Sequence, residues 1–274
     1  MRKLKTSGAY LFLIISCIFT VFPMIFMVGL SLRTKVDLIQ QGVLKIPEAL
    51  HFENYVEAWT QGRFSTYFSN SVIVSVMSVL GVVVLSTLIA YAMVYYEFKG
   101  KVIVNALILI GLIIPFEIVI IPLFHNMKTV GLLGTRASVY LTHIALNIPF
   151  AVFLLRGFIK DIPRSIVESA RMDGAPELTV LRKIVVPVVV PAMVSIVILI
   201  FMWTWNDFML PNIMLRNDSV RTLPLGLAYF QGKYSRDIPL TSAASVIIML
   251  PVLVVYLIFQ KHMIKGLTMG AVKE

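Results

Sequence analysis

Six long apolar runs constrain the fold of this chain more than any other feature. Each holds about 20 or more mostly apolar residues, the length that an α-helix needs to cross the hydrocarbon core of a bilayer. The runs are continuous, whereas the strands of a membrane β-barrel show short alternating patterns. We therefore expect an all-α integral membrane protein with six transmembrane helices, over residues 8–31, 69–95, 102–124, 137–156, 187–208 and 239–260.

The composition supports a membrane protein and argues against a nucleic-acid binder. Of the 274 residues 58% are hydrophobic and 14% are charged, whereas about 25% are charged in a soluble domain. The net charge of +10 forms no basic stripe interleaved with aromatic residues, the pattern that nucleic-acid binding favours. A single cysteine, Cys17, excludes an internal disulfide framework. We expect contact with the lipid bilayer and no nucleic-acid partner.

The distribution of Lys and Arg predicts the orientation. With the N-terminus inside, the segments 1–8, 96–101, 156–186 and 261–274 hold 14 of the 24 basic residues in 59 positions, and the outside segments hold 10 in 86. This twofold excess in density agrees with the positive-inside rule. Both termini are therefore predicted to be cytoplasmic.

The first apolar run raises the question of a cleaved signal. The residues Ile14–Cys17 are similar to a lipoprotein cleavage site, but the run continues to Leu32. Signal h-regions span only about 7 to 15 residues and end near the cut. We expect a retained first helix with Cys17 buried in it, and one transmembrane domain over residues 1–274.

The longest inside loop, residues 157–186, is predicted to form two short helices. Asp161 is expected to cap the first helix, with Pro163 in its first turn. Gly174 ends this helix because glycine accepts the left-handed conformation, and Pro176 lies in the first turn of the second helix. Spacing alone leaves two interpretations open, a helical element that docks into a groove of a soluble partner and an ordinary solvated loop.

The same loop carries an ordered motif. Glu168-Ser169-Ala170 is followed by Gly174, then by Ile184 and Pro187. This order and spacing resemble the Glu-Ala-Ala loop of ABC importer permeases. Ser169 replaces an alanine of the family pattern, and Val186 replaces a leucine. Both changes conserve size or apolar character.

Other short motifs extend the likeness over nearly the whole chain. They are Asn54-Tyr55, Asn70-Ser71, Ile114-Pro115, Ile121–Phe124, Pro149-Phe150, Leu155–Phe158, Trp205–Phe208, Thr222–Pro224, Lys265–Thr268 and Gly270–Lys273. Together they resemble the carbohydrate branch of the family, specifically the shorter of its two permeases, similar to the maltose and multiple-sugar type.

The resemblance implies a type I ABC importer permease fold in a prokaryotic cell membrane. It implies a second permease subunit, two ATP-binding subunits and an extracytoplasmic solute-binding protein as partners, and a sugar or oligosaccharide as substrate. The chain has no Gly-x-x-x-x-Gly-Lys-Ser/Thr motif, so it is expected not to be an enzyme and to bind no cofactor, with ATP and Mg on the partner ATPase. The residues expected to couple to that ATPase are Glu168, Ser169, Ala170, Asp173, Gly174, Ala175 and Leu178.

Five polar residues inside or at the ends of the apolar runs are candidates for the solute path: Glu117, His143, Asn147, Asn206 and Asp207. A charge inside a membrane span is expensive and often functional, but Glu117 is equally consistent with a protonated acid bonded to a neighbouring helix. His143 and Asn147 lie one helical turn apart, and such groups more often form hydrogen bonds between helices. Asn206 and Asp207 are candidates for contact with sugar hydroxyls. An alternative function is a secondary transporter or channel that works without an ATPase, for which Glu117 is the ion-site candidate.

Overall fold

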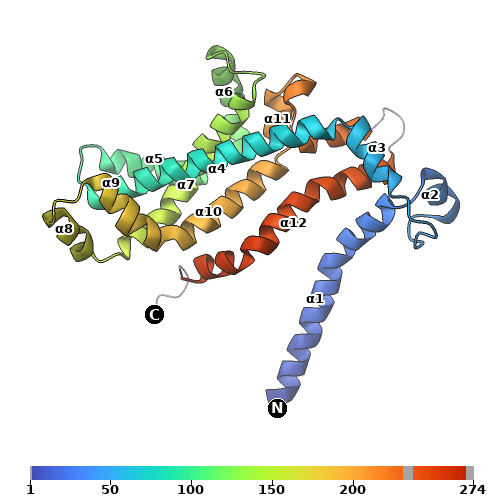
Figure 1. Cartoon of the computed structure of the whole chain (residues 1–274), viewed down its shortest axis with the longest axis horizontal. Helices are drawn as coiled ribbons and strands as arrows, with labels where there is room; N and C mark the ends of the chain where they lie inside the picture. Colours follow the sequence, from blue (N-terminus) through green and yellow to red (C-terminus); the bar gives the residue numbers. More distant parts are fainter. Residues whose placement is uncertain (1, 231–236, 270–274) are drawn as a thin grey trace. The chain divides into compact units, whose positions relative to one another are not determined.

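The computed structural model describes residues 2–230 and 237–269, and every regular element in these ranges is helical (Figure 1). The elements are α1 (Arg2–Ser31), α2 (Lys35–Gln41), α3 (Glu53–Gln61), α4 (Phe64–Tyr95), α5 (Lys101–Ile113), α6 (Phe116–Thr129), α7 (Arg136–Lys160), α8 (Arg164–Met172), α9 (Glu177–Val180), η1 (Leu181–Val185), α10 (Val186–Asn206), α11 (Met209–Met214), η2 (Asp218–Val220), η3 (Leu223–Phe230) and α12 (Ile238–Met269). The motif Gly270–Lys273 lies outside the described residues.

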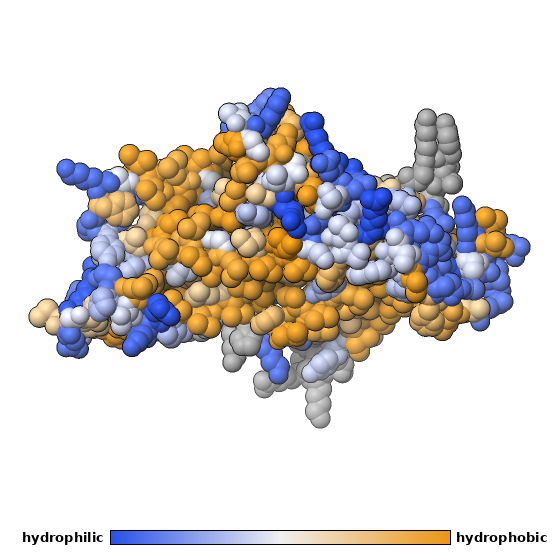
Figure 2. Space-filling model, turned by 45° about the horizontal axis from the view of Figure 1, so that its top comes forward, coloured by the Kyte–Doolittle hydropathy of each residue, from blue (hydrophilic) through white to orange (hydrophobic). Residues whose placement is uncertain are grey.

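Five helical segments are long and apolar enough to cross a membrane: Tyr10–Ser31, Phe64–Tyr95, Arg136–Lys160, Glu177–Asn206 and Ile238–Lys261. The pair α5 and α6 passes the same test when taken together, which gives up to six spans. Apolar residues dominate the face of the molecule drawn in Figure 2. The all-helical membrane class predicted from the apolar runs is therefore confirmed, with five or six apolar spans.

The predicted third span, residues 102–124, is wrong as a single helix. The structure divides it into α5 and α6, which are bent by 112° at the break. Pro115 has no backbone N–H and disfavours the helical conformation in the residue before it. Ile114 accordingly adopts an extended conformation, with φ −68° and ψ 119°.

The predicted fifth span also begins earlier than expected. Helical structure runs without interruption from Glu177 through the π-helical turn η1 into α10. Pro187 is the second residue of α10, two positions after this turn ends, and its missing N–H interrupts the regular α-helical hydrogen bonds. The wider π-helical pattern accommodates such interruptions and occurs often at functional sites.

The chain separates into two compact units, residues 1–65 with 225–251 and residues 66–224 with 252–274. The single domain expected over residues 1–274 stays a prediction. In the first unit the buried Arg33 side chain binds the loop that follows α1, because its guanidinium donates hydrogen bonds to the carbonyls of Asp37, Gly42 and Lys45 at 2.7–3.0 Å. Cys17 in α1 is exposed, so its expected burial is not found.

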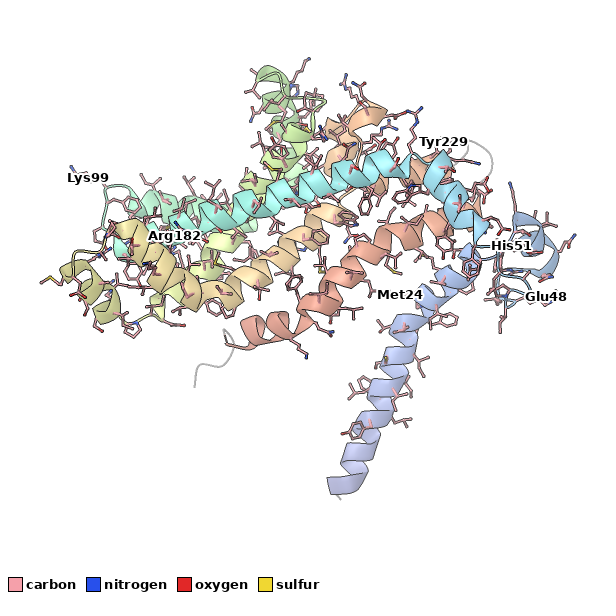
Figure 3. All side chains as sticks on the ribbon, viewed as in Figure 1. Met24, Glu48, His51, Lys99, Arg182 and Tyr229 are labelled. Carbon is pink, nitrogen blue, oxygen red and sulfur yellow. The ribbon has the colours of Figure 1, made fainter. Side chains whose placement is uncertain are left out.

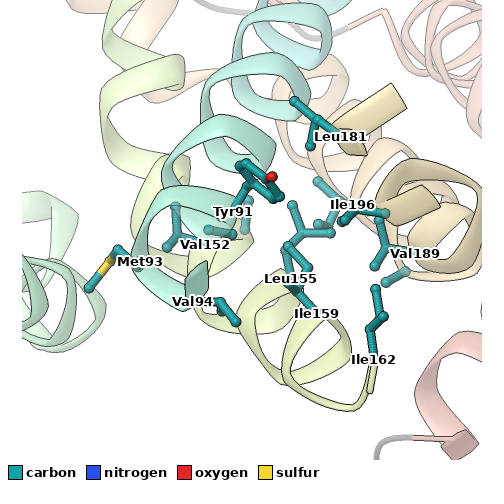
Figure 4. Packing of buried hydrophobic residues seen from close by; sticks show 14 of the residues in the cluster. Tyr91, Met93, Val94, Val152, Leu155, Ile159, Ile162, Leu181, Val189 and Ile196 are labelled. Atoms are coloured by element: carbon teal, nitrogen blue, oxygen red, sulfur yellow. The ribbon is translucent and has the colours of Figure 1, made fainter. Parts of the chain in front are cut away.

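The second unit contains the larger apolar core, drawn in Figure 4. The core joins α4, α7 and α10 through side chains such as Tyr91, Leu155 and Ile196, and it includes Val167 of α8. Two glycines allow helices to approach closely. A Cβ at Gly81 would lie 2.3 Å from Ile144, and a Cβ at Gly111 would lie 2.6 Å from Pro149.

Candidate functional site

The segment formed by α8, its turn and α9, called here the α8–α9 segment (residues 164–180), has the helix–turn–helix form that the sequence predicts. Gly174 ends α8 with φ +80°. The Gly174 and Ala175 N–H groups donate to the carbonyls of Arg171 and Ala170, both at 3.0 Å. The left-handed glycine and these two bonds make the sharp turn between the helices.

The starts of the two helices differ from the prediction. Asp161 does not cap α8, because α7 continues to Lys160 and Asp161 becomes its C-terminal cap. Pro163 and Pro176 are the N-cap residues of α8 and α9, and neither helix start has a side-chain cap. Both prolines lie one position before the first turn, with ψ values of 126° and 149°.

The α8–α9 segment has one buried side and one exposed side. Val167 and Val180 are buried in the core of the second unit, and Ala170 and Ala175 pack against that core. The predicted coupling residues Glu168, Ser169, Asp173, Gly174 and Leu178 are exposed. Three large apolar side chains of the segment are also exposed, Ile166 at 49%, Met172 at 89% and Leu178 at 61%.

An ion pair that the sequence analysis did not identify joins α8 to α9. The Arg171 guanidinium donates from Nε and Nη2 to the two carboxylate oxygens of Glu177, at 2.8 and 3.1 Å. The Tyr91 hydroxyl of α4 donates to the same carboxylate. The hydrogen bonds to Glu177 raise the pKa of Arg171, so the guanidinium stays charged.

Three tyrosines at the end of α4 surround this ion pair. The Arg171 guanidinium lies 5.9 Å from the ring centre of Tyr95 and 5.5 Å from that of Tyr96, within the range of cation–π attraction. The Tyr91 and Tyr95 rings are 5.1 Å apart. The group of Tyr91, Tyr95, Tyr96, Arg171 and Glu177 is called here the tyrosine clamp. It attaches the exposed segment to a transmembrane helix.

The tyrosine clamp lies at the end of α4, and Figure 1 shows α8 and α9 at this end of the second unit. The sequence signal for the clamp is the spacing of the tyrosines, which recur at positions 91, 95 and 96. Residues four apart share a helix face, but the position of their charged partners depends on the fold.

Four of the five candidate path residues line one cavity of about 520 Å³, called here the polar cavity. His143 and Asn147 come from α7, and Asn206 and Asp207 come from the end of α10. The His143 and Asp207 side chains are 8% and 17% exposed. The fold therefore brings together polar groups that are more than 50 residues apart in the sequence.

The hydrogen bonds of the polar cavity lie mainly within single helices. Asn147 and Asn206 donate to the carbonyls of His143 and Met202, one turn earlier in their own helices, at 2.7 and 2.9 Å. His143 Nε2 lies 3.2 Å from Asp207 Oδ2 but makes no hydrogen bond in the required geometry. These four residues therefore form no hydrogen bond to one another across the cavity. Their one close polar contact across it is that of His143 with Asp207.

Asp207 also has a structural role. Its Oδ1 accepts hydrogen bonds from the Met209 and Leu210 N–H groups, at 2.9 and 3.3 Å, and so stabilises the start of α11. Trp203 lines the polar cavity and packs edge-on against Phe150, with the ring centres 5.3 Å apart. Trp205 is buried between the rings of Phe68 and Phe201.

Glu117 does not join the polar cavity. The break at Pro115 places it in the first turn of α6, where the helix dipole favours a carboxylate, and not in the middle of a helix. Its side chain is exposed and makes no hydrogen bond or ion pair with any described residue. In the part of the chain that the structure describes, no three His, Cys, Asp or Glu side chains form a group that could hold a metal ion.

Comparison with known proteins gives consistent matches. The family model for the binding-protein-dependent transport system inner membrane component matches residues 82–268. The chain is 34% identical to the arabinooligosaccharides transport system permease protein AraQ of Halalkalibacterium halodurans, over 92% of this chain and 91% of that protein. It is 33% identical to the multiple sugar-binding transport system permease protein MsmG of Streptococcus mutans, over 99% of both.

A solved structure has the same fold. One chain of a bacterial ABC transporter that imports the acidic polysaccharide alginate aligns with a TM-score of 0.84 and 24% identity, over 95% of this chain and 96% of that one.

Proposed function

Because the chain belongs to the family of binding-protein-dependent transport system inner membrane components, the permeases of ABC importers, we propose that it forms the translocation path for a sugar or oligosaccharide together with a second permease subunit. The names of its relatives support this substrate class, since they include transporters of arabinooligosaccharides and of multiple sugars. Two ATP-binding subunits and an extracytoplasmic solute-binding protein complete the assembly. ATP and Mg bind to the partner ATPase, and this chain performs no chemistry.

The α8–α9 segment is the proposed contact with an ATP-binding subunit. The observation that carries this proposal is the combination of a buried anchor at Val167 with exposed apolar side chains at Met172 and Leu178. Exposed apolar groups beside charged ones are typical of a docking surface. Glu168 is exposed beside them and is available to a basic group of the partner. With this segment in the cytoplasm, both termini are cytoplasmic.

The polar cavity is the proposed contact with substrate. Sugar hydroxyls both donate and accept hydrogen bonds, and the cavity offers carboxylate, imidazole and amide groups beside an aromatic ring. Such a mixture of apolar walls and a few polar groups is characteristic of small-molecule sites. His143, Asn147, Asn206 and Asp207 are the residues proposed to meet the substrate.

Copurification of the full transporter tests this function. The tagged chain is expressed with the products of its neighbouring genes, solubilised in mild detergent and examined for bound subunits. Recovery of a second permease and an ATPase, both reduced by replacement of Glu168 and Gly174, is the expected result. A lone chain that transports solute in liposomes without ATP would show a secondary transporter or channel and would refute the proposal.

A further inference from the structure

Three cavities meet at Arg156 near the end of α7. They have volumes of about 390, 380 and 450 Å³, and the Arg156 side chain lines all three. The surrounding elements are the end of α4, the start of α5, the end of α7 and the residue that begins α8. This group, called here the basic cavities, is lined by different residues from those of the polar cavity.

Four cationic side chains converge on the basic cavities. Lys101 lines two of them, Lys160 lines two, Arg164 lines one and Arg156 lines all three. The acids at the same place are Glu97, which forms an ion pair with Lys101 at 2.9 Å, and Asp161. The cations therefore exceed the acids by two, and the cavities favour an anion.

Arg156 has a hydrogen-bond donor without an acceptor. One of its terminal amino groups donates to the Asn105 side chain, but its Nε is buried and makes no hydrogen bond. A buried donor without a partner is costly and indicates a missing acceptor. The start of α5 adjoins the same place, and its N-cap residue, Gly100, provides no side-chain acceptor. Free N–H groups at a helix start favour phosphate.

Apolar residues line the other side of the basic cavities. Ile108, Leu109, Phe153 and Phe158 line the cavity of about 390 Å³, on the spans of α5 and α7. Under the proposed orientation this place lies at the cytoplasmic boundary of the membrane. A ligand that fits has a phosphate for the cations and a hydrocarbon chain for the apolar wall. The positive-inside rule explains basic residues near span ends, but not their convergence on a half-buried arginine.

From this arrangement we infer that the basic cavities bind the headgroup of an anionic phospholipid, with the phosphate at Arg156 and an acyl chain along α5 and α7. Basic pockets between helices on the cytoplasmic side bind anionic lipid headgroups in other membrane proteins. This site concerns the membrane environment of the chain and does not depend on the nature of the transported substrate.

The test uses the purified transporter, depleted of lipid in detergent. The number of phosphatidylglycerol molecules retained is measured by native mass spectrometry, and the rise in melting temperature is measured on adding phosphatidylglycerol, phosphatidylcholine or inorganic phosphate. The variant is Lys160→Gln with Arg164→Gln, because both side chains are exposed and their loss leaves the core intact. The matched control is Arg182→Gln with Lys183→Gln, an equal loss of charge at exposed positions outside the cavities (Arg182 is labelled in Figure 3).

Phosphatidylglycerol is expected to bind the unchanged transporter and to raise its melting temperature. Phosphatidylcholine and inorganic phosphate are expected to do neither. Two basic groups near a membrane surface contribute enough that the variant should bind the lipid about tenfold or more weakly, while the control binds as before. An equal loss of phosphatidylglycerol binding in the variant and the control would show that the lipid is held by general attraction to surface charge. That result would overturn the proposed site. Equal stabilisation by inorganic phosphate would show a free-anion site and overturn the lipid assignment.

Discussion

The α8–α9 segment and the polar cavity both contain polar residues but use them differently. In the α8–α9 segment the charged groups bind one another, since Arg171 and Glu177 form a two-pronged ion pair under Tyr91. In the polar cavity the two asparagines bind only their own helices. The first arrangement fixes the shape of an exposed element, and the second leaves donors and acceptors facing an open space. A rigid surface suits docking to a protein, and an open cavity suits passage of a solute.

The largest expected effect follows from Gly174→Asp. Gly174 has φ +80°, and a Cβ there would meet no atom within 4 Å. The free-energy cost of the substitution therefore comes from the backbone conformation and not from a steric clash. Placing a side chain in the left-handed region costs about 1–2 kcal/mol, which corresponds to roughly a tenfold change in a docking equilibrium. We expect normal insertion and ATP hydrolysis that no longer drives uptake, as measured by sugar uptake and ATPase assays on the reconstituted transporter.

The matched control for Gly174 is Gly131→Asp. Gly131 has φ +72° and equally open surroundings, but it lies in the turn after α6. This variant is expected to keep uptake coupled to hydrolysis. If both variants lose coupling equally, or if Gly174→Asp transports normally, the coupling role of the turn is wrong.

A smaller effect is expected from Arg171→Gln, which breaks the tyrosine clamp. The ion pair is partly exposed, with 31% and 45% of the two side chains accessible, so its contribution is limited to about 1 kcal/mol. We expect faster amide exchange over residues 164–180 and about fivefold weaker coupling. Lys45→Gln removes one partner of an exposed ion pair elsewhere and is the control. Unchanged exchange in Arg171→Gln would show that the clamp does not hold the segment.

The polar cavity is tested by Asp207→Asn. The amide oxygen still accepts the Met209 N–H, so the start of α11 is kept, while the negative charge beside His143 is lost. Loss of one substrate hydrogen bond costs about 0.5–1.5 kcal/mol, and we expect the KM for uptake to rise about threefold. Glu117→Gln, a charge change outside the cavity, is expected to leave KM unchanged. A larger effect at Glu117 would favour the secondary transporter.

The smallest effect is expected from Ser75→Ala and Ser78→Ala in α4. Both hydroxyls are buried and make no hydrogen bond. Removing an unpaired polar group of small size is nearly neutral or slightly stabilising. The melting temperature and uptake should stay the same, because these hydroxyls contribute no hydrogen bond. A marked fall in uptake would place the face of α4 in the solute path.

The sequence allowed prediction of the features that depend on local order. Continuous apolar runs predict spans, and the spacing of Glu168, Gly174 and Pro187 predicts the short helices and the turn between them. The glycine turn was predicted because its conformation is a property of one residue. The start of α8 was not, because the competing extension of α7 to Lys160 depends on packing.

Features that depend on two distant segments were predicted only in part. The four polar residues of the cavity were identified separately, but their meeting depends on how α7 packs against α10. Tyr91 and Glu177 are 86 positions apart in the sequence, and the hydrogen bond between them was not predicted. The apolar run predicted one span over residues 102–124, and the break of 112° at Pro115, which places Glu117 in the first turn of α6, was not predicted.

Docking of the α8–α9 segment to an ATP-binding subunit is tested directly by cysteine crosslinking of Met172 in the assembled transporter. Cys17 is the only cysteine, so Cys17→Ser gives a cysteine-free background for Met172→Cys. Val130→Cys, an exposed position in the turn after α6, is the control. We expect that Met172→Cys forms a crosslink to an ATP-binding subunit and that Val130→Cys does not. Equal crosslinking at the two positions, or none at Met172, would contradict the docking of the α8–α9 segment to the ATPase.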